Sequence, residues 1–148
     1  DCGLLRAEKI RHPKGDLGRV GEIIEVQTAC LLELLSLGYA TIFSPISLGS
    51  DGRPLNVNAD HAALAIAKAL QVHEAIFLTD VPGVMVDGQV VSELSGEQVR
   101  QWIETGVITG GMIPKVRSAL QVIESGVGAV RITNLEGLAH SSGTRVSA

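Results

Sequence analysis

The sequence is poor in aromatic side chains, because phenylalanine, tryptophan and tyrosine together make up 3% of its 148 residues. Hydrophobic residues nevertheless account for 45% of the chain and charged residues for only 19%, which excludes a disordered tail. The core must therefore be built from alanine, valine, isoleucine and leucine. Together with 17 glycines, which permit close backbone approaches, this composition is typical of α/β enzymes that handle nucleotides.

Cysteine is also scarce, since Cys2 and Cys30 are the only two in the chain. No Cys-x-x-Cys pair occurs, and none of the four histidines stands at a metal-ligand spacing. The sequence therefore predicts neither a disulfide framework nor a metal held by the protein itself.

Strong charge and long apolar segments are missing too. A net charge of −4 provides no field that would attract nucleic acid or an anionic membrane. No apolar run approaches the roughly 20 residues that a membrane-spanning helix needs, and no basic leader segment follows Asp1. We therefore expect a cytoplasmic protein that binds neither nucleic acid nor membranes.

Two glycine fingerprints of nucleotide enzymes are absent. The chain contains neither Gly-x-Gly-x-x-Gly nor Gly-x-x-x-x-Gly-Lys-Ser/Thr, which argues against a nicotinamide-dependent dehydrogenase and against a P-loop enzyme. A Gly-x-Ser-x-Gly nucleophile motif is also missing, so nothing points to covalent catalysis.

Local patterns predict helices that alternate with short apolar strands. The predicted helices cover residues 28–37, 58–70, 95–104 and 112–125. The predicted strands cover residues 4–10, 23–26, 40–43, 75–78, 129–132 and 143–146, and a ribbon over 84–93 turns at Asp87-Gly88. This alternation favours an α/β fold in which helices cover both faces of a mostly parallel sheet decorated by two hairpins. A mild boundary falls at residues 71–73.

The segment Asn56-Val57-Asn58-Ala59-Asp60 leads from a loop into an alanine-rich helix. In one interpretation Asn58 simply caps the helix and Asp60 complements its dipole. In the other, the exposed amides hold a small polar substrate while Asp60 orients nearby cations. Periodicity alone favours the first interpretation and leaves the second open.

The turn at residues 79–83, Thr-Asp-Val-Pro-Gly, follows directly after an apolar strand. Ligands of open α/β sheets collect at the carboxyl ends of strands, so the turn could line a nucleotide pocket. A purely structural turn explains these residues equally well.

Lys115 stands in the first turn of a predicted helix, after Gly110-Gly111 and Pro114. A cation is unfavourable there by a few tenths of a kcal/mol, roughly, because the helix dipole is positive at that end. A nearby anion would offset this cost, and the glycine pair would let the backbone approach one. Phosphate is the obvious candidate, although a solvated surface lysine remains the alternative.

Five motifs occur in the order found in acetylglutamate kinases. They are DLGRVGE at residues 16–22, LNVNAD at 55–60, LTDVPGV at 78–84, ITGGMIPKV at 108–116 and GTRV at 143–146. Over nearly its whole length the chain therefore resembles the acetylglutamate kinases of the amino acid kinase family.

The resemblance implies an α/β fold, an open three-layer αβα sandwich whose central sheet is mostly parallel. It also implies transfer of the γ-phosphoryl group of Mg²⁺-bound ATP to the γ-carboxylate of N-acetyl-L-glutamate in arginine biosynthesis, by an assembly of at least two chains. On matching positions Asn56 would hold N-acetyl-L-glutamate, Asp60 would orient the catalytic lysines and Lys115 would stabilise the transition state. The implied nucleotide contacts are Asp80, Val81, Pro82, Gly83, Val84, Met85, Val107, Ile108 and Thr109.

The resemblance has a gap at its front. Family members carry an earlier segment with a second catalytic lysine, a Gly-Gly loop and an arginine for acetylglutamate, and nothing of this kind precedes Asp1. We therefore expect residues 1–72 to be the remainder of the acetylglutamate-binding lobe and residues 73–148 to be the ATP-binding lobe. Alone, the chain is expected to be a poorly active fragment.

The tail lacks the longer, leucine-rich acidic segment that accompanies feedback inhibition by arginine in some members, so we expect insensitivity to arginine. Two alternatives remain open. One is a related kinase for carrier-linked aminoadipate, which shares the Asn-x-Asn-Ala-Asp signature. The other is a non-catalytic nucleotide-binding module.

Overall fold

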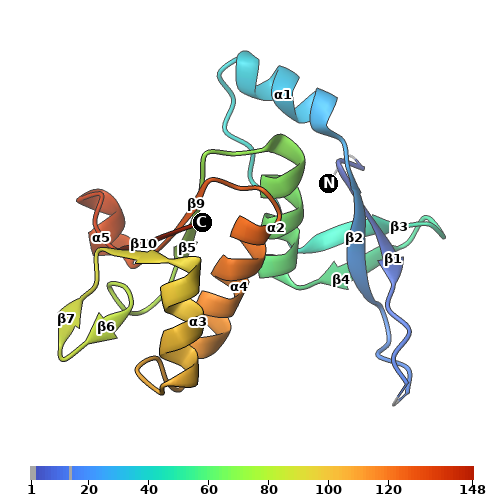
Figure 1. Cartoon of the computed structure of the whole chain (residues 1–148). Coiled ribbons are helices and arrows are strands. Elements are labelled where there is room, and N and C mark those ends of the chain that lie inside the picture. The colour runs from blue at the N-terminus through green and yellow to red at the C-terminus, as the bar shows by residue number, and fades with distance from the viewer. Residues whose placement is uncertain (1–2, 14) are drawn as a thin grey trace. The chain divides into compact units, whose positions relative to one another are not determined.

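The computed structural model describes residues 3–13 and 15–148. The chain divides into two compact units, Asp1–Leu70 (unit 1) and Gln71–Ala148 (unit 2). Both units combine helices with short strands (Figure 1), so the predicted α/β class is confirmed. Within the described residues, no helix is both long enough and apolar enough to cross a membrane.

Unit 1 contains a small closed barrel of four strands. β1 (Leu5–Lys9) and β2 (Val20–Val26) form the predicted antiparallel hairpin. β3 (Ile46–Gly49) and β4 (Pro54–Val57) form a second hairpin around the turn at residues 50–52. Parallel pairing of β1 with β3 and of β2 with β4 closes the barrel.

Two helices accompany the barrel, α1 (Thr28–Ser36) and α2 (Ala59–Leu70), and both form where the sequence predicts them. Asn58 caps α2, because its side-chain oxygen accepts hydrogen bonds from the backbone N–H groups of Asp60 (2.9 Å) and His61 (3.1 Å). α2 packs against β2. One core cluster of the unit consists of Ala7, Leu55, Val57 and Ala62, with Ile23 packed against them.

The prediction of a strand at residues 40–43 is wrong. These residues have no regular structure, and the strand that follows α1 begins only at Ile46. A short apolar run has the pattern of a buried strand, but it forms a strand only if another strand pairs with it. Among the described residues none pairs with this segment, and the side chain of Ile42 is 96% exposed.

Unit 2 is organised around a four-stranded sheet with the order β5-β9-β10-β8. β5 (Glu74–Leu78) lies parallel to β9 (Ala129–Thr133), and β10 (Thr144–Ser147) lies parallel to β8 (Glu93–Ser95). Only the central pair, β9 with β10, is antiparallel. The sheet of this unit is therefore mostly parallel, as predicted, whereas unit 1 mixes both kinds of pairing.

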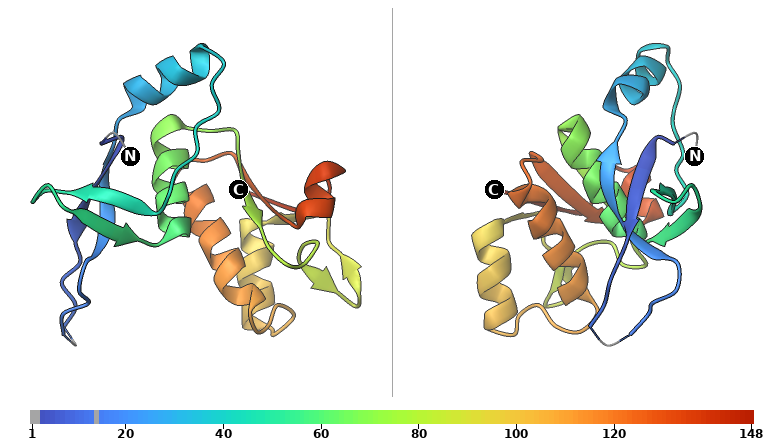
Figure 2. Two further views of the ribbon diagram at one scale, coloured as in Figure 1. Left: turned by 180° about the vertical axis from the view of Figure 1, so that it is seen from behind. Right: turned by 90° about the vertical axis from the view of Figure 1, so that its right-hand side faces the viewer.

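The two long helices of unit 2, α3 (Gly96–Glu104) and α4 (Met112–Glu124), lie side by side (Figure 2), and α4 packs on β9 and β10. Ser95 and Gln98 form a reciprocal capping box at the start of α3. α4 buries residues at helical spacing, namely Val116, Ala119, Leu120 and Val122.

The predicted ribbon is also present, as β6 (Met85–Val86) and β7 (Gln89–Val90). Asp87 and Gly88 both have positive φ, at 51° and 78°, as a two-residue hairpin turn with the twist of its strands requires. A short helix, α5 (Leu135–Ala139), was not predicted. Its signal is Asn134, whose side chain accepts a hydrogen bond from the Gly137 N–H at 2.7 Å.

Thr144 ties β10 to the two segments that flank the β6–β7 ribbon. Its side chain is fully buried, its oxygen accepts a hydrogen bond from the Val84 N–H at 2.7 Å, and its hydroxyl donates to the Val91 carbonyl at 2.6 Å. A threonine with both hydrogen-bonding roles filled in this way fixes the loop without any metal or disulfide.

We predict that Thr144→Val, which keeps the shape of the side chain, lowers the free energy of unfolding by about 2 kcal/mol because buried polar groups lose their partner. Chemical denaturation monitored by circular dichroism would measure the change. The matched control is Thr105→Val at the exposed end of α3, where the hydroxyl bonds only to the Gln101 carbonyl. Equal effects of the two substitutions would refute the structural role of Thr144.

Candidate functional site

The end of β5 and the end of β9 lie together at one edge of the sheet in unit 2. The backbone N–H of Thr79, directly after β5, donates to the Thr133 carbonyl at the end of β9, with a distance of 2.8 Å. Because the two strands are parallel, their carboxyl ends meet at this edge, where α/β sheets commonly bind ligands.

Lys115 is positioned by the first turn of α4, which begins directly after Gly110 and Gly111. Its ammonium group donates one hydrogen bond to the Thr79 hydroxyl oxygen and another, at 3.0 Å, to the Asp80 carboxylate. The Thr79 hydroxyl in turn donates to the same carboxylate oxygen at 2.8 Å. The three side chains therefore form one closed network, which we call the Lys115 cluster.

The electrostatics of the Lys115 cluster explain how a cation is stable at the start of a helix. The hydrogen bond from the Thr79 hydroxyl, followed by that from the Lys115 ammonium, holds the pKa of the Asp80 carboxyl below its ordinary value. Asp80 therefore supplies an anion beside Lys115. The side chain of Asp80 is 87% exposed and that of Lys115 is 36% exposed, so the cluster is accessible to a ligand from solvent.

A cavity of about 160 Å³ is formed by the two segments that adjoin the cluster in sequence. Its lining consists of Val81, Gly83, Val84, Met85, Val107, Ile108, Thr109 and Met112. The structure thus brings together every predicted nucleotide contact except Asp80 and Pro82. The volume is below the roughly 300–1,000 Å³ of a pocket for a whole drug-sized ligand, so the cavity could enclose only part of such a ligand.

The wall of the cavity at residues 83–84 depends on close packing. A Cβ atom added to Gly83 would lie 2.6 Å from the Thr144 hydroxyl oxygen, which is too close for any side chain. The same hydroxyl oxygen accepts the hydrogen bond from Val84. Glycine at position 83 is therefore required by this approach. The GTRV motif at 143–146 contains Thr144, but the sequence does not indicate which residues Thr144 contacts.

The other predicted site residues, Asn56 and Asp60, belong to unit 1. Asn56 is exposed on β4, and its backbone N–H donates to the Arg19 carbonyl at 2.8 Å. Asp60 is exposed in the first turn of α2. Neither side chain has a hydrogen-bond partner within residues 3–13 and 15–148, whereas Asn58 is used as the helix cap. The capping interpretation therefore holds for Asn58, and the carboxamide of Asn56 stays available.

Sequence reasoning missed two members of the site. Thr79 was seen only as part of a turn, although a hydroxyl directly after an apolar strand and before an aspartate is a usable signal. Met112 lines the cavity because it opens α4, which depends on where the helix begins. Among the described residues no group of three potential metal ligands lies together.

Comparison with known proteins identifies the family of the chain. The model of the amino acid kinase family matches residues 2–134. The acetylglutamate kinase of Roseiflexus sp. (strain RS-1) is 51% identical over 147 residues, which are 99% of this chain and 56% of that protein. The chain thus spans little more than half the length of the curated relatives it matches.

Solved structures agree with this assignment. The protein smu.665 from Streptococcus mutans UA159 has 34% identity and a TM-score of 0.78, over 98% of this chain and 57% of that one. Carbamate kinase from Giardia lamblia bound to AMP-PNP, at 20% identity and a TM-score of 0.62, shares the fold over 86% of this chain and 46% of its own. The resemblance predicted from the order of the five motifs is confirmed, and the chain belongs to the amino acid kinase family.

Proposed function

We propose that the chain is part of an acetylglutamate kinase, which phosphorylates the γ-carboxylate of N-acetyl-L-glutamate with ATP to give N-acetyl-L-glutamyl 5-phosphate in arginine biosynthesis. The proposal rests on the Lys115 cluster. The residues next to this cluster in the sequence line a cavity, and most of the expected nucleotide contacts are among them. The 51% identity to a relative named acetylglutamate kinase supports the choice of substrate.

In the proposed reaction, a carboxylate oxygen of N-acetyl-L-glutamate attacks the γ-phosphorus of ATP. The bond between that phosphorus and the oxygen bridging to the β-phosphate breaks, and ADP leaves. Negative charge is spread over the phosphoryl oxygens in the transition state, so the protein contributes mainly by positioning and by charge stabilisation. The ammonium group of Lys115, held by Thr79 and Asp80, is the cation suited to that charge.

We infer that Mg²⁺ enters the site on the phosphates of ATP. Mg²⁺ usually keeps several waters and binds substrate phosphates with one or two carboxylates, rather than a cage made by the protein. This mode of binding is compatible with the described residues, which contain no group of three potential metal ligands. The nucleotide base would occupy the cavity lined by Val84, Met85 and Ile108.

In unit 1 the proposed roles follow the resemblance. The free carboxamide of Asn56 would hold N-acetyl-L-glutamate, and the carboxylate of Asp60 would orient the catalytic cations. Residues 1–72 are accordingly proposed as part of the acetylglutamate-binding lobe and residues 73–148 as the ATP-binding lobe. A cytoplasmic location and an assembly of at least two chains stay predictions.

The function is tested with a chimera in which this chain replaces the matching residues of the Roseiflexus relative. We expect this chimera to release ADP from Mg²⁺-ATP only when N-acetyl-L-glutamate is present. Substituting Lys115→Ala should lower its kcat about 10²- to 10³-fold, because a preorganised charge is lost in the transition state.

The matched control is Arg117→Ala, since Arg117 is exposed on the same helix and has no partner among the described side chains. It should leave kcat within twofold, roughly, as expected for a surface change. Binding of ATP without turnover that depends on the acceptor would instead indicate a non-catalytic nucleotide-binding module.

Thr79 provides a second test, because its hydroxyl holds both Lys115 and Asp80. Thr79→Val should raise the pKa of the Asp80 carboxyl, since the hydrogen bond from Thr79 is the largest cause of its lowering. Asp80 in the variant would then become protonated at a higher pH. NMR titration of the 148-residue chain would record this change, and the hydroxyl-bearing Thr79→Ser should restore the original titration.

In the chimera, Thr79→Val should also lower kcat about tenfold, as expected for a lost positioning interaction, while Thr79→Ser stays near the parent value. A pKa shift accompanied by equal activity of both variants would show that Thr79 has no part in positioning Lys115.

Gly111 tests whether a ligand approaches the start of α4. Its φ is −67°, and an added Cβ atom would meet nothing within 4 Å, so nothing in the described chain requires glycine there. Gly111→Ala should therefore leave the unfolding transition unchanged but weaken ATP binding about tenfold, or about 1.4 kcal/mol. Isothermal titration calorimetry would measure the affinity, and unchanged affinity would argue that the nucleotide does not reach Gly111.

A further inference from the structure

The DLGRVGE motif at residues 16–22 leads into β2 and reaches across to the β3–β4 hairpin of unit 1. Its arginine, Arg19, makes the connection. The guanidinium group donates to both carboxylate oxygens of Asp51 at 3.2 Å and, through Nε, to the Pro54 carbonyl at 2.7 Å. The backbone carbonyl of Arg19 accepts a hydrogen bond from the Asn56 N–H at 2.8 Å. We call these four hydrogen bonds the Arg19 clamp.

The Arg19 clamp reaches the β3–β4 hairpin at three points along the chain. Asp51 lies in the turn, Pro54 is the first residue of β4 and Asn56 is its third. The strands β2 and β4 share little else, because among the described residues their parallel pairing comprises only two residue pairs. The clamp therefore fixes where β4 lies along β2, and it fixes the position of Asn56 with it.

The backbone that leads to Arg19 is held as well. The Asp16 carboxylate accepts a hydrogen bond from the Gly18 N–H at 3.0 Å and forms an ion pair of 2.7 Å with Lys9 of β1. Gly18 has a φ of 70°, a backbone conformation that glycine adopts readily, and it turns the chain toward β2. The clamp is thus connected to β1 as well as to β2.

The chemistry of the clamp suits positioning more than stability. The side chains of Arg19 and Asp51 are 43% and 53% exposed, and exposed ion pairs contribute little to the free energy of unfolding. A guanidinium group that donates to both oxygens of one carboxylate does fix a geometry, because the two bonds are parallel. The hydrogen bond from Arg19, followed by that from the Arg53 N–H, also holds the pKa of the Asp51 carboxyl below its ordinary value.

Asn56 is the residue whose placement matters for a ligand. Its neighbours on β4, Leu55 and Val57, are buried in the core cluster, and successive side chains of a strand point to opposite faces. The Asn56 side chain therefore points away from that cluster, and it is exposed. A binding group acts well only when the element that carries it is held in place.

We propose that Arg19 is a positioning residue for substrate binding, whose bonds to Asp51 and Pro54 hold β4 so that Asn56 presents its carboxamide to the acceptor. The inference rests on the proposed function, in which that acceptor is N-acetyl-L-glutamate. Arg19 acts through the strand and not by contact with the substrate, because the Asp51 carboxylate already balances its charge.

Kinetics of the chimera with the Roseiflexus relative test this role. Arg19→Ala should raise KM for N-acetyl-L-glutamate about tenfold, as expected for a misplaced binding group, while KM for ATP stays within about twofold. Arg19→Lys should resemble Arg19→Ala, because an ammonium group keeps the charge but lacks the planar fork. A KM near the parent value for Arg19→Lys would overturn the proposal, since charge alone would then be sufficient.

A double-mutant cycle shows whether Arg19 acts through Asn56. In a chimera that already carries Asn56→Ala, adding Arg19→Ala should change kcat/KM for N-acetyl-L-glutamate by less than about twofold, because the group that Arg19 positions is gone. Two effects that simply multiply would show that Arg19 and Asn56 act independently, which is the result expected of a merely structural arginine.

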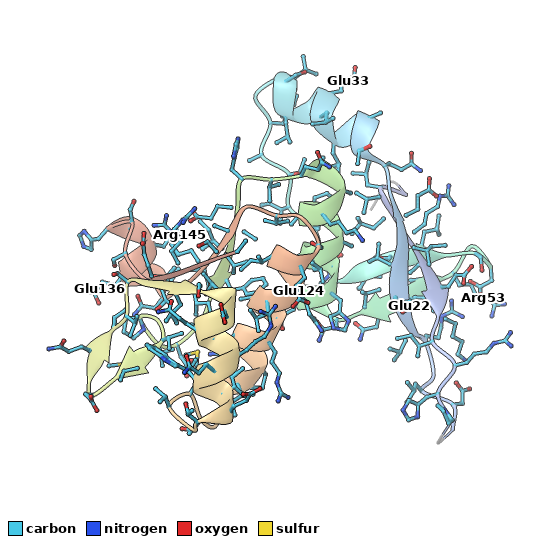
Figure 3. All side chains as sticks on the ribbon, viewed as in Figure 1. Glu22, Glu33, Arg53, Glu124, Glu136 and Arg145 are labelled. Carbon is cyan, nitrogen blue, oxygen red and sulfur yellow. The ribbon has the colours of Figure 1, made fainter. Side chains whose placement is uncertain are left out.

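The matched control is Arg53→Ala, an exposed arginine of the same hairpin that Figure 3 shows at its turn end. Within the part of the chain that the structure describes, Arg53 bonds to Asp51 through its backbone N–H, which alanine keeps. Arg53→Ala should leave both KM values within about twofold, as for an ordinary surface change. An effect as large as that of Arg19→Ala would count against the clamp.

Hydrogen exchange in the 148-residue chain measures the placement of Asn56 without any substrate. Arg19→Ala should speed exchange of the Asn56 N–H about tenfold, because β4 loses contacts that hold it beside the Arg19 carbonyl. The Gln27 N–H, which donates to the Leu4 carbonyl at 2.9 Å outside the clamp, should keep its rate. Equal acceleration of both amides, or of neither, would overturn the proposal.

Failure of the inference and failure of the proposed function give different results. A parent chimera without turnover that depends on N-acetyl-L-glutamate would refute the proposed function, and the exchange rates would still decide whether Arg19 holds Asn56. Normal turnover with a KM for the acceptor that Arg19→Ala leaves unchanged would refute the inference alone.

Discussion

A positive charge at the start of a helix is the constraint around which unit 2 is arranged. The dipole of α4 disfavours Lys115 in its first turn, so the lysine depends on groups outside the helix. Those groups are supplied by the end of β5, as the Thr79 hydroxyl and the Asp80 carboxylate. The parallel pairing of β5 with β9 fixes the position of the strand end. The groups at this strand end then stabilise the ammonium group of Lys115.

The composition of the chain shapes the site in a less direct way. A core with few aromatic rings is filled by small side chains, which lets backbone segments approach one another closely. Two of these approaches are very close. A Cβ atom added to Gly83 would lie 2.6 Å from the Thr144 hydroxyl oxygen, and one added to Gly143 would lie 2.6 Å from the Ile132 carbonyl oxygen. At Gly83 the close approach is accompanied by a hydrogen bond from the Val84 N–H to the Thr144 hydroxyl oxygen.

Local signals were sufficient for much of this fold. Capping at Asn58, the Asp87-Gly88 turn and the helical pattern of α4 all act over a few residues, and the sequence predicts each of them. The order of the motifs also pointed to the segments that line the cavity. Sequence reasoning failed where the outcome depends on a distant partner. Residues 40–43 have the side chains of a strand, but they pair with no other strand among the described residues.

The same limit applies within the candidate site. The partners of Thr79 and Val84 are 36 and 60 residues away along the chain, so no local pattern could reveal either pair. The strand β4 was not predicted, and it begins with Pro54, a residue that is rare inside strands. Proline is tolerated there because it occupies the first position.

The sixty-residue separation between Val84 and Thr144 also bears on how the protein is made. Synthesis proceeds from the amino terminus, and segments fold as they emerge. The loop at residues 83–84 is complete in sequence long before its buried hydrogen-bond partner exists. A nascent chain that ends before residue 144 therefore lacks the hydrogen bond that holds Val84 in the lining of the cavity. The shape of the cavity is thus fixed only when β10 joins the sheet.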